Sequence, residues 1–153
     1  MKKLNEYEIR QVVLPSVTKV LRIFVGLLVD RKFDDLSREF DLNCSKDDFQ
    51  AAVELQEDSS HADGAFIKPP DEAFVDIICT DEYDCSFASQ PNCFPPGFRT
   101  HNVDIWLAYA EEQINIDFFL WNRNGRTDVT LHLTTTFPTR GEIQITGVDL
   151  LVM

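Results

Sequence analysis

Three histidines are the side chains best suited to acid–base chemistry in this sequence. His132 falls in the alternating segment 127–137, on the side that also carries threonines. If the preceding segment pairs with it as a neighbouring strand, Asp117 faces His132. A carboxylate that orients an imidazole inside a pocket is the arrangement a general acid or base needs. His132 and Asp117 are therefore candidate catalytic residues, and the simpler alternative is a surface histidine in contact with a carboxylate.

Other motifs for chemistry are weak. A set of Cys79, Cys85, Cys93 and His101 lacks the short Cys spacing typical of zinc sites. We find no phosphate-binding glycine loop and no Ser-His-Asp order, so we expect no metal, no cofactor and no enzyme activity. Cys79 ends an apolar run and is predicted to be a buried thiol, whereas Cys85 and Cys93 either stay reduced or pair under oxidation.

The net charge of −12 over 153 residues is the strongest compositional feature. Residues 30–63 contain eleven acidic and four basic side chains. Residues 71–84 contain six acidic side chains and no basic one. Such acidity disfavours nucleic acid and anionic membranes, which attract Lys and Arg. It favours a basic protein partner, whose approach it accelerates, although acidity that only keeps a protein soluble is the alternative.

The second acidic stretch also contains aromatic side chains, which anchor many protein interfaces. We therefore predict that contacts to a basic partner come from the following residues: Asp81, Glu82, Tyr83, Asp84 and Phe87. The surrounding segment 80–100 has no clean period and three prolines, which predicts a long loop and leaves the strand order there open.

Helical periodicity in the first third and alternation in the second half predict a single α+β domain over residues 1–153. Helices are expected at about 5–57, with Pro15 in the first turn of the main helix, a separate short helix before it, and Ser45 as a helix cap. A curved antiparallel sheet is expected at about 73–153, with a turn at Asn124-Gly125 and a bulge near Gly147.

The aromatic residues Trp106, Phe119 and Trp121 fall on the face of this sheet opposite to the apolar one. That face is therefore not fully solvated, and a structural homodimer that uses it is one alternative function.

The segment LWNRNGRTDVTLHLTTT, residues 120–136, resembles small bacterial proteins that look like members of the cone-shaped nuclear transport factor 2-like fold. The resemblance covers Ile114 to Met153 well and the remainder in outline. It implies helices packed on a bent sheet. Some proteins of that fold are isomerases or dehydratases with an Asp–His pair, for which the resemblance implies Asp104, Asp117 and His132 as the candidates here.

In size, acidity and organisation the chain also resembles immunity proteins of bacterial toxin systems, including contact-dependent growth inhibition. That resemblance implies a protein that binds and neutralises a basic toxin, such as a nuclease, by occluding its active site. The alternatives are a small-ligand binder or isomerase/dehydratase-like enzyme and the homodimer.

The N-terminal residues have no apolar run before Glu6 and Glu8, unlike a signal peptide. The apolar stretch 17–29 contains Lys19 and Arg22 and is too short to cross a bilayer. We therefore expect a cytoplasmic protein without a membrane partner.

Overall fold

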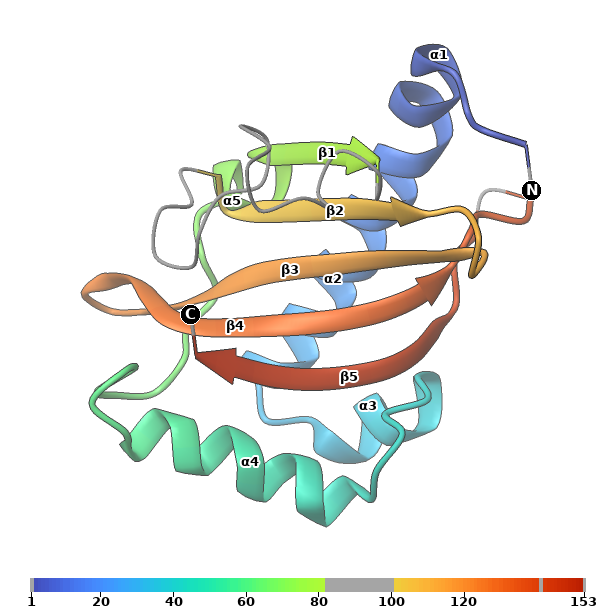
Figure 1. The fold of residues 1–153 in the computed structure, drawn as a ribbon. Coiled ribbons are helices and arrows are strands. Elements are labelled where there is room, and N and C mark those ends of the chain that lie inside the picture. The colour runs from blue at the N-terminus through green and yellow to red at the C-terminus, as the bar shows by residue number, and fades with distance from the viewer. Residues whose placement is uncertain (1, 82–100, 141, 153) are drawn as a thin grey trace.

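The structure, a computed structural model, describes residues 2–81, 101–140 and 142–152. It has an α+β architecture in which helices come first in the chain and the sheet follows, as the periodicity predicts (Figure 1). The described elements are α1 (Glu6–Glu8), η1 (Ile9–Val13), α2 (Leu14–Val29), α3 (Phe33–Glu39), α4 (Lys46–Asp58), α5 (Glu72–Val75), β1 (Ile77–Asp81), β2 (Val103–Ala108), β3 (Gln113–Asn122), β4 (Gly125–Thr136) and β5 (Ile145–Val152).

The first three elements form one continuous helical segment, so the prediction of a separate helix before Pro15 is wrong. Proline has no N–H to donate to the preceding turn. The chain forms a wider π-helical turn just before it, in which the Leu14 N–H donates to the Ile9 carbonyl. The segment begins at a capping box, where the Asn5 side chain accepts from the Glu8 N–H at 2.8 Å.

This segment, Glu6–Val29, is by length and composition able to cross a membrane. In the fold, its apolar stripe packs into the core, with Val17, Leu21 and Phe24 fully buried. Figure 1 shows α2 crossing behind the sheet, where it covers the inner sheet face.

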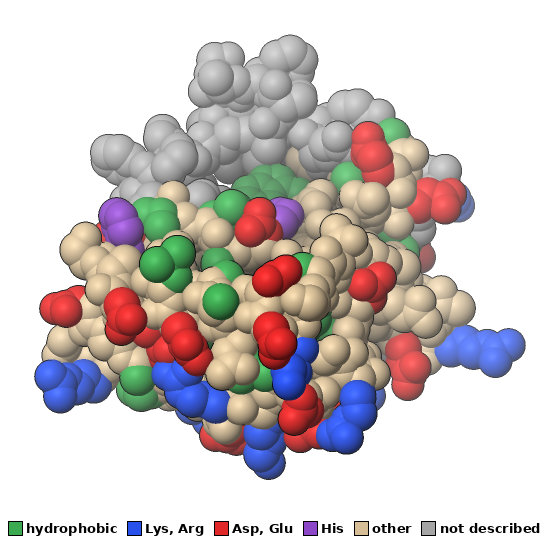
Figure 2. All heavy atoms as spheres, turned by 90° about the horizontal axis from the view of Figure 1, so that it is seen from below, with side chains coloured by type: hydrophobic (Ala, Val, Ile, Leu, Met, Phe, Trp, Pro, Cys, Tyr) green, Lys and Arg blue, Asp and Glu red, His purple; other side chains and the backbone are tan. Residues whose placement is uncertain are grey.

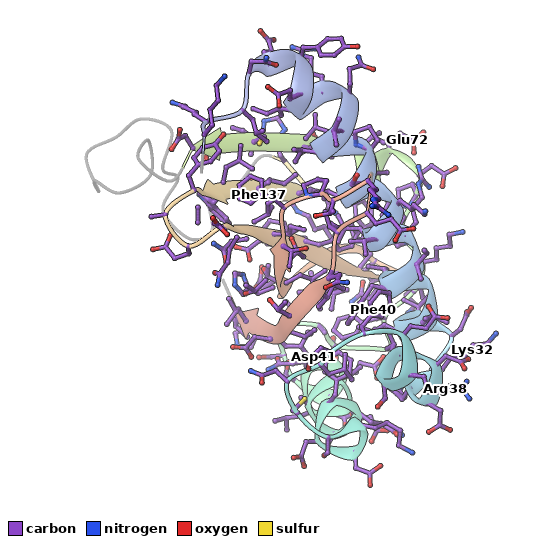
Figure 3. The ribbon with its side chains drawn as sticks, turned by 90° about the vertical axis from the view of Figure 1, so that its right-hand side faces the viewer. Lys32, Arg38, Phe40, Asp41, Glu72 and Phe137 are labelled. Atoms are coloured by element: carbon purple, nitrogen blue, oxygen red, sulfur yellow. The ribbon has the colours of Figure 1, made fainter. Side chains whose placement is uncertain are left out.

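Helices α3 and α4 extend this core beyond the sheet. The Phe24 ring lies 5.4 Å from that of Phe40 and 6.0 Å from that of Phe49, which α4 contributes. Helix α4 begins where predicted, because the Ser45 hydroxyl accepts from the Asp48 N–H at 3.1 Å. Figure 3 shows Lys32 and Arg38 on the outer side of this region, pointing away from the sheet.

The five described strands form an open sheet in the order β1-β2-β3-β4-β5. The sheet is mixed, so the prediction of a purely antiparallel sheet is wrong for one strand: β1 runs parallel to β2. Residues 82–102 connect these two strands, and a connection of this length permits the crossover that parallel pairing requires. The predicted start of the sheet near residue 73 is also wrong, since Glu72–Val75 form a helical turn with the Ala73 N–H donating to the Pro70 carbonyl.

Two further predictions for the sheet, the turn at Asn124-Gly125 and the bulge near Gly147, are confirmed. Strands β3 and β4 form a hairpin that pairs Asn122 with Gly125, whose φ of +120° lies in the left-handed region that favours glycine. Between β4 and β5 the register shifts at Gly147, which faces Thr134, while Ile145 faces Thr135.

Because Phe24 joins α2, α3 and α4, truncating it tests the core. We expect F24A to lower the free energy of unfolding by about 3–5 kcal/mol, through lost burial and a residual cavity. Urea unfolding followed by circular dichroism measures this loss. I23A, one residue away but 40% exposed, is the matched control, with an expected loss below about 1 kcal/mol; equal losses would contradict this packing.

Candidate functional site

The outer face of the sheet carries a row of ionisable side chains, one from each of four neighbouring strands. Asp104 lies opposite Asp117, Asp117 opposite His132, and His132 opposite Asp149. Side chains alternate between the two faces of a strand, so the apolar residues that cover α2 force these four onto the other face. Asp104 and Asp117 are buried, whereas Asp149 is exposed.

His132 and Asp117 form a direct contact, as the sequence predicts. The Nδ1 atom of His132 lies 2.5 Å from Oδ1 of Asp117. The aspartate is 4% exposed and the histidine side chain 27% exposed, so a buried carboxylate holds a partly accessible imidazole. The arrangement fixes the ring and leaves Nε2 as its second nitrogen, which is the orientation an acid–base residue requires.

The rest of this face is more buried than a solvated sheet surface. Phe119 is 6% exposed, and the Arg126 guanidinium lies 4.6 Å from the centre of its ring. The indole N–H of Trp121 donates to Oδ1 of Asn102 at 2.9 Å. Thr130 is fully buried, and its hydroxyl has no partner among the described residues. The prediction that the outer face of the sheet is not fully solvated is therefore confirmed.

The described cavities lie elsewhere. Those of about 310, 350 and 610 Å³ are lined by neither His132 nor Asp117.

In the part of the chain that the structure describes, no three His, Cys, Asp or Glu side chains converge as metal ligands. His101 contacts Asp76 at 2.8 Å. The acid–base alternative thus has its dyad but no described pocket around it, and it stays a prediction.

Of the residues predicted to contact a basic partner, Asp81 is the one that the structure describes. It ends β1 on the helix-facing side, is 8% exposed and lies 2.8 Å from the Lys3 ammonium. Glu82, Tyr83, Asp84 and Phe87 lie outside the described residues. Cys85 and Cys93 lie there too, so their pairing is equally untested.

The first acidic stretch, in contrast, is described in full. Three of its four basic residues are engaged: Arg38 with Asp35, Lys46 with Asp34, and Arg31 with Glu57. These pairs leave carboxylates in excess on α3 and α4. Figure 2 shows this side of the molecule, with acidic side chains spread over it and basic ones among them.

Helix α4 has an exposed acidic face, which we define by five residues at helical spacing: Asp47, Ala51, Glu54, Leu55 and Asp58. All five are exposed, and Leu55 is 69% exposed. The opposite side of the helix buries Phe49 and Val53. Sequence reasoning missed Leu55, although its position two residues after Val53 places it away from the buried stripe.

Cys79 lies on the helix-facing side of β1, and its thiol is largely shielded. Burial, and then the negative charge of Asp81, raises its pKa to about 11. Cys79 is thus half-buried against the core, so the prediction of a buried thiol holds in part. Cys44 is exposed as a residue. Its pKa is also raised, chiefly by the partial desolvation of its sulfur and secondly by the negative charge of Asp48.

Comparison with known proteins gives no relative. No family model, no curated protein and no solved structure matches the chain significantly.

The dyad can be tested through stability. We expect D117N to lower the free energy of unfolding by about 1–3 kcal/mol, because the buried side chain loses its charge-assisted hydrogen bond to His132. D149N, exposed on the other side of His132, is the control, with an expected change within about 0.5 kcal/mol. Chemical unfolding at neutral pH measures both. A D117N protein as stable as the parent would show that repulsion from Asp104 cancels the histidine contact.

The pKa of Cys79 predicts slow alkylation. The thiolate is the reactive form, and with a pKa of about 11 only about one thiol in a thousand is ionised at pH 8. We expect iodoacetamide to modify Cys44 at least about tenfold faster than Cys79 in the native protein. Raising the pH from 8 to 9 should speed the Cys79 reaction, since the thiolate fraction grows toward the raised pKa. Peptide mass spectrometry separates the two sites, and equal native rates would contradict the shielding.

Proposed function

We propose that this chain is a cytoplasmic immunity protein that binds a basic bacterial toxin, such as a nuclease, and occludes its active site. The observation that carries the proposal is the exposed acidic face of α4, where three carboxylates surround Ala51 and Leu55. It lies on a protein with a net charge of −12, in a segment whose acidic residues outnumber its basic ones.

The physical argument joins charge with an apolar contact. A nuclease must hold phosphates, so its cleft is basic. The field of an acidic protein speeds the encounter with such a cleft, and carboxylates placed opposite its cations fix the register. Leu55 would then lose its 69% exposure against the toxin, which adds apolar burial at the centre of the charged patch.

The acid–base alternative is favoured by one specific observation, the 2.5 Å contact between His132 and Asp117. A cone-shaped fold of the nuclear transport factor 2 type would supply the pocket that such chemistry needs. The toxin-binding proposal does not depend on that fold, because its contacts come from the outer side of α4 rather than from a cavity.

The test needs a toxin domain as its probe, for which the reading frames beside this gene are searched first. We expect D47N/E54Q/D58N to slow association with it by about tenfold at low salt, because three steering charges at the contact are lost. E111Q/E112Q/E142Q removes the same number of exposed acidic charges elsewhere and should change the on-rate by less than about threefold. Stopped-flow fluorescence over a range of salt concentrations measures both.

L55A should raise the dissociation constant by about tenfold without changing the on-rate, since it removes apolar contact and not charge. Equal slowing by both triple variants would show that only total charge matters. If E82Q/D84N alone weakens toxin binding, the contact lies in the second acidic stretch and not on α4. A toxin domain that does not bind the parent protein at all would overturn the proposed function.

A further inference from the structure

A groove of about 610 Å³ lies on the opposite edge of the sheet from α4, between the N-terminal helical segment and β1. Leu14 and Pro15 line it from the helix side, and Val75 and Ile77 from the chain that enters β1. Val75 is 59% exposed. Figure 1 shows β1 and α5 at the upper edge of the sheet and α4 at the lower edge.

The groove has a basic rim on an acidic protein. Arg10, Lys19 and Arg22 line it, and none of its described lining residues is Asp or Glu. Arg10 also contacts Glu6 at 2.9 Å, and Arg22 contacts Asp71 at 3.0 Å. Residues 1–29 as a whole contain five basic and two acidic residues, the reverse of the balance in the rest of the chain.

The two walls of the groove are fixed to each other. The Arg22 guanidinium lies 5.0 Å from the centre of the Phe74 ring in α5. The Thr18 hydroxyl donates to the Phe74 carbonyl at 3.5 Å. A site that is already formed loses less conformational entropy when it binds.

We propose that this groove docks a segment of a partner protein that combines apolar side chains with carboxylates. Apolar side chains would cover Leu14 and Val75, and carboxylates would meet Arg10 and Lys19. From Arg10 to Arg22 the helix side extends about 18 Å, which about six extended residues can follow. The proposal is independent of toxin binding, because it concerns a basic surface on the other edge of the sheet.

Two other occupants fit less well. A second copy of this chain brings another net charge of −12 to the surface, so association would be opposed by repulsion of the two molecules. An anionic bilayer faces the same repulsion. A short acidic segment brings carboxylates to Lys19 and to the two arginines, which already contact Glu6 and Asp71, without placing a second large negative charge against the protein.

The test is a titration of the full chain with a fluorescein-labelled peptide of about ten residues that alternates Leu with Glu. We expect saturable binding, measured by fluorescence anisotropy, that weakens about tenfold in K19E/V75E. K68E/V152E carries the same two kinds of change at exposed positions outside both the groove and the acidic face of α4 and should stay within about twofold of the parent. A peptide with Lys in place of Glu should not bind.

Toxin binding by K19E/V75E separates the two proposals, since this variant should retain it. Equal weakening in both double variants, or no binding of the acidic peptide, would overturn the groove proposal. Two further results would overturn it. If light scattering shows that the parent self-associates and K19E/V75E does not, the groove binds a second copy. If the parent floats with phosphatidylglycerol vesicles and K19E/V75E does not, the groove binds a membrane.

Discussion

The packing of α2 against one face of the sheet is the constraint from which the other features follow. Val17, Leu21 and Phe24 are fully buried there, against strand residues such as Ile116 and Leu131 that point to the same side. Because side chains alternate along a strand, this burial fixes the register and decides which residues face away. A slip of one residue would expose the apolar set and bury the ionisable row.

The same constraint explains the contact between His132 and Asp117. Once β3 and β4 turn their apolar residues to α2, these two side chains share the outer face at paired positions. Their contact is thus a consequence of register, and it would be present whether or not the protein performs acid–base chemistry. The acidic face of α4 arises similarly, because Phe49 and Val53 turn inward and carry Asp47, Glu54 and Leu55 outward.

Much of the fold could be predicted from the sequence because its local patterns are strong. Alternation in residues 114–136 gave the correct faces of two strands, and Ser45 gave the start of α4. The parallel pairing of β1 could not be predicted, since short apolar strands look alike whichever neighbour they pair with. Pro15 lies in the first turn of α2, as predicted. The prediction of a separate helix before it failed because a π-helical turn makes the helical segment continuous, and that turn has no simple sequence pattern.

The candidate site was harder to predict for a related reason. Charge counts located the acidic stretches, but exposure and ion pairing depend on the fold: Asp81 turns out to be buried beside Lys3, whereas Leu55 is exposed. The groove between α2 and β1 joins residues far apart in the chain, so no local pattern marks it. Surfaces formed by non-local packing therefore need the structure, even where each element is predictable.

The most direct measurement is amide hydrogen exchange of the full chain, with and without a basic toxin domain that it binds. We expect slower exchange on binding in α4, centred on the turn that contains Glu54 and Leu55, with no change around Val75 and Ile77. Unchanged exchange throughout α4 in a saturated complex would contradict the proposed toxin-binding surface.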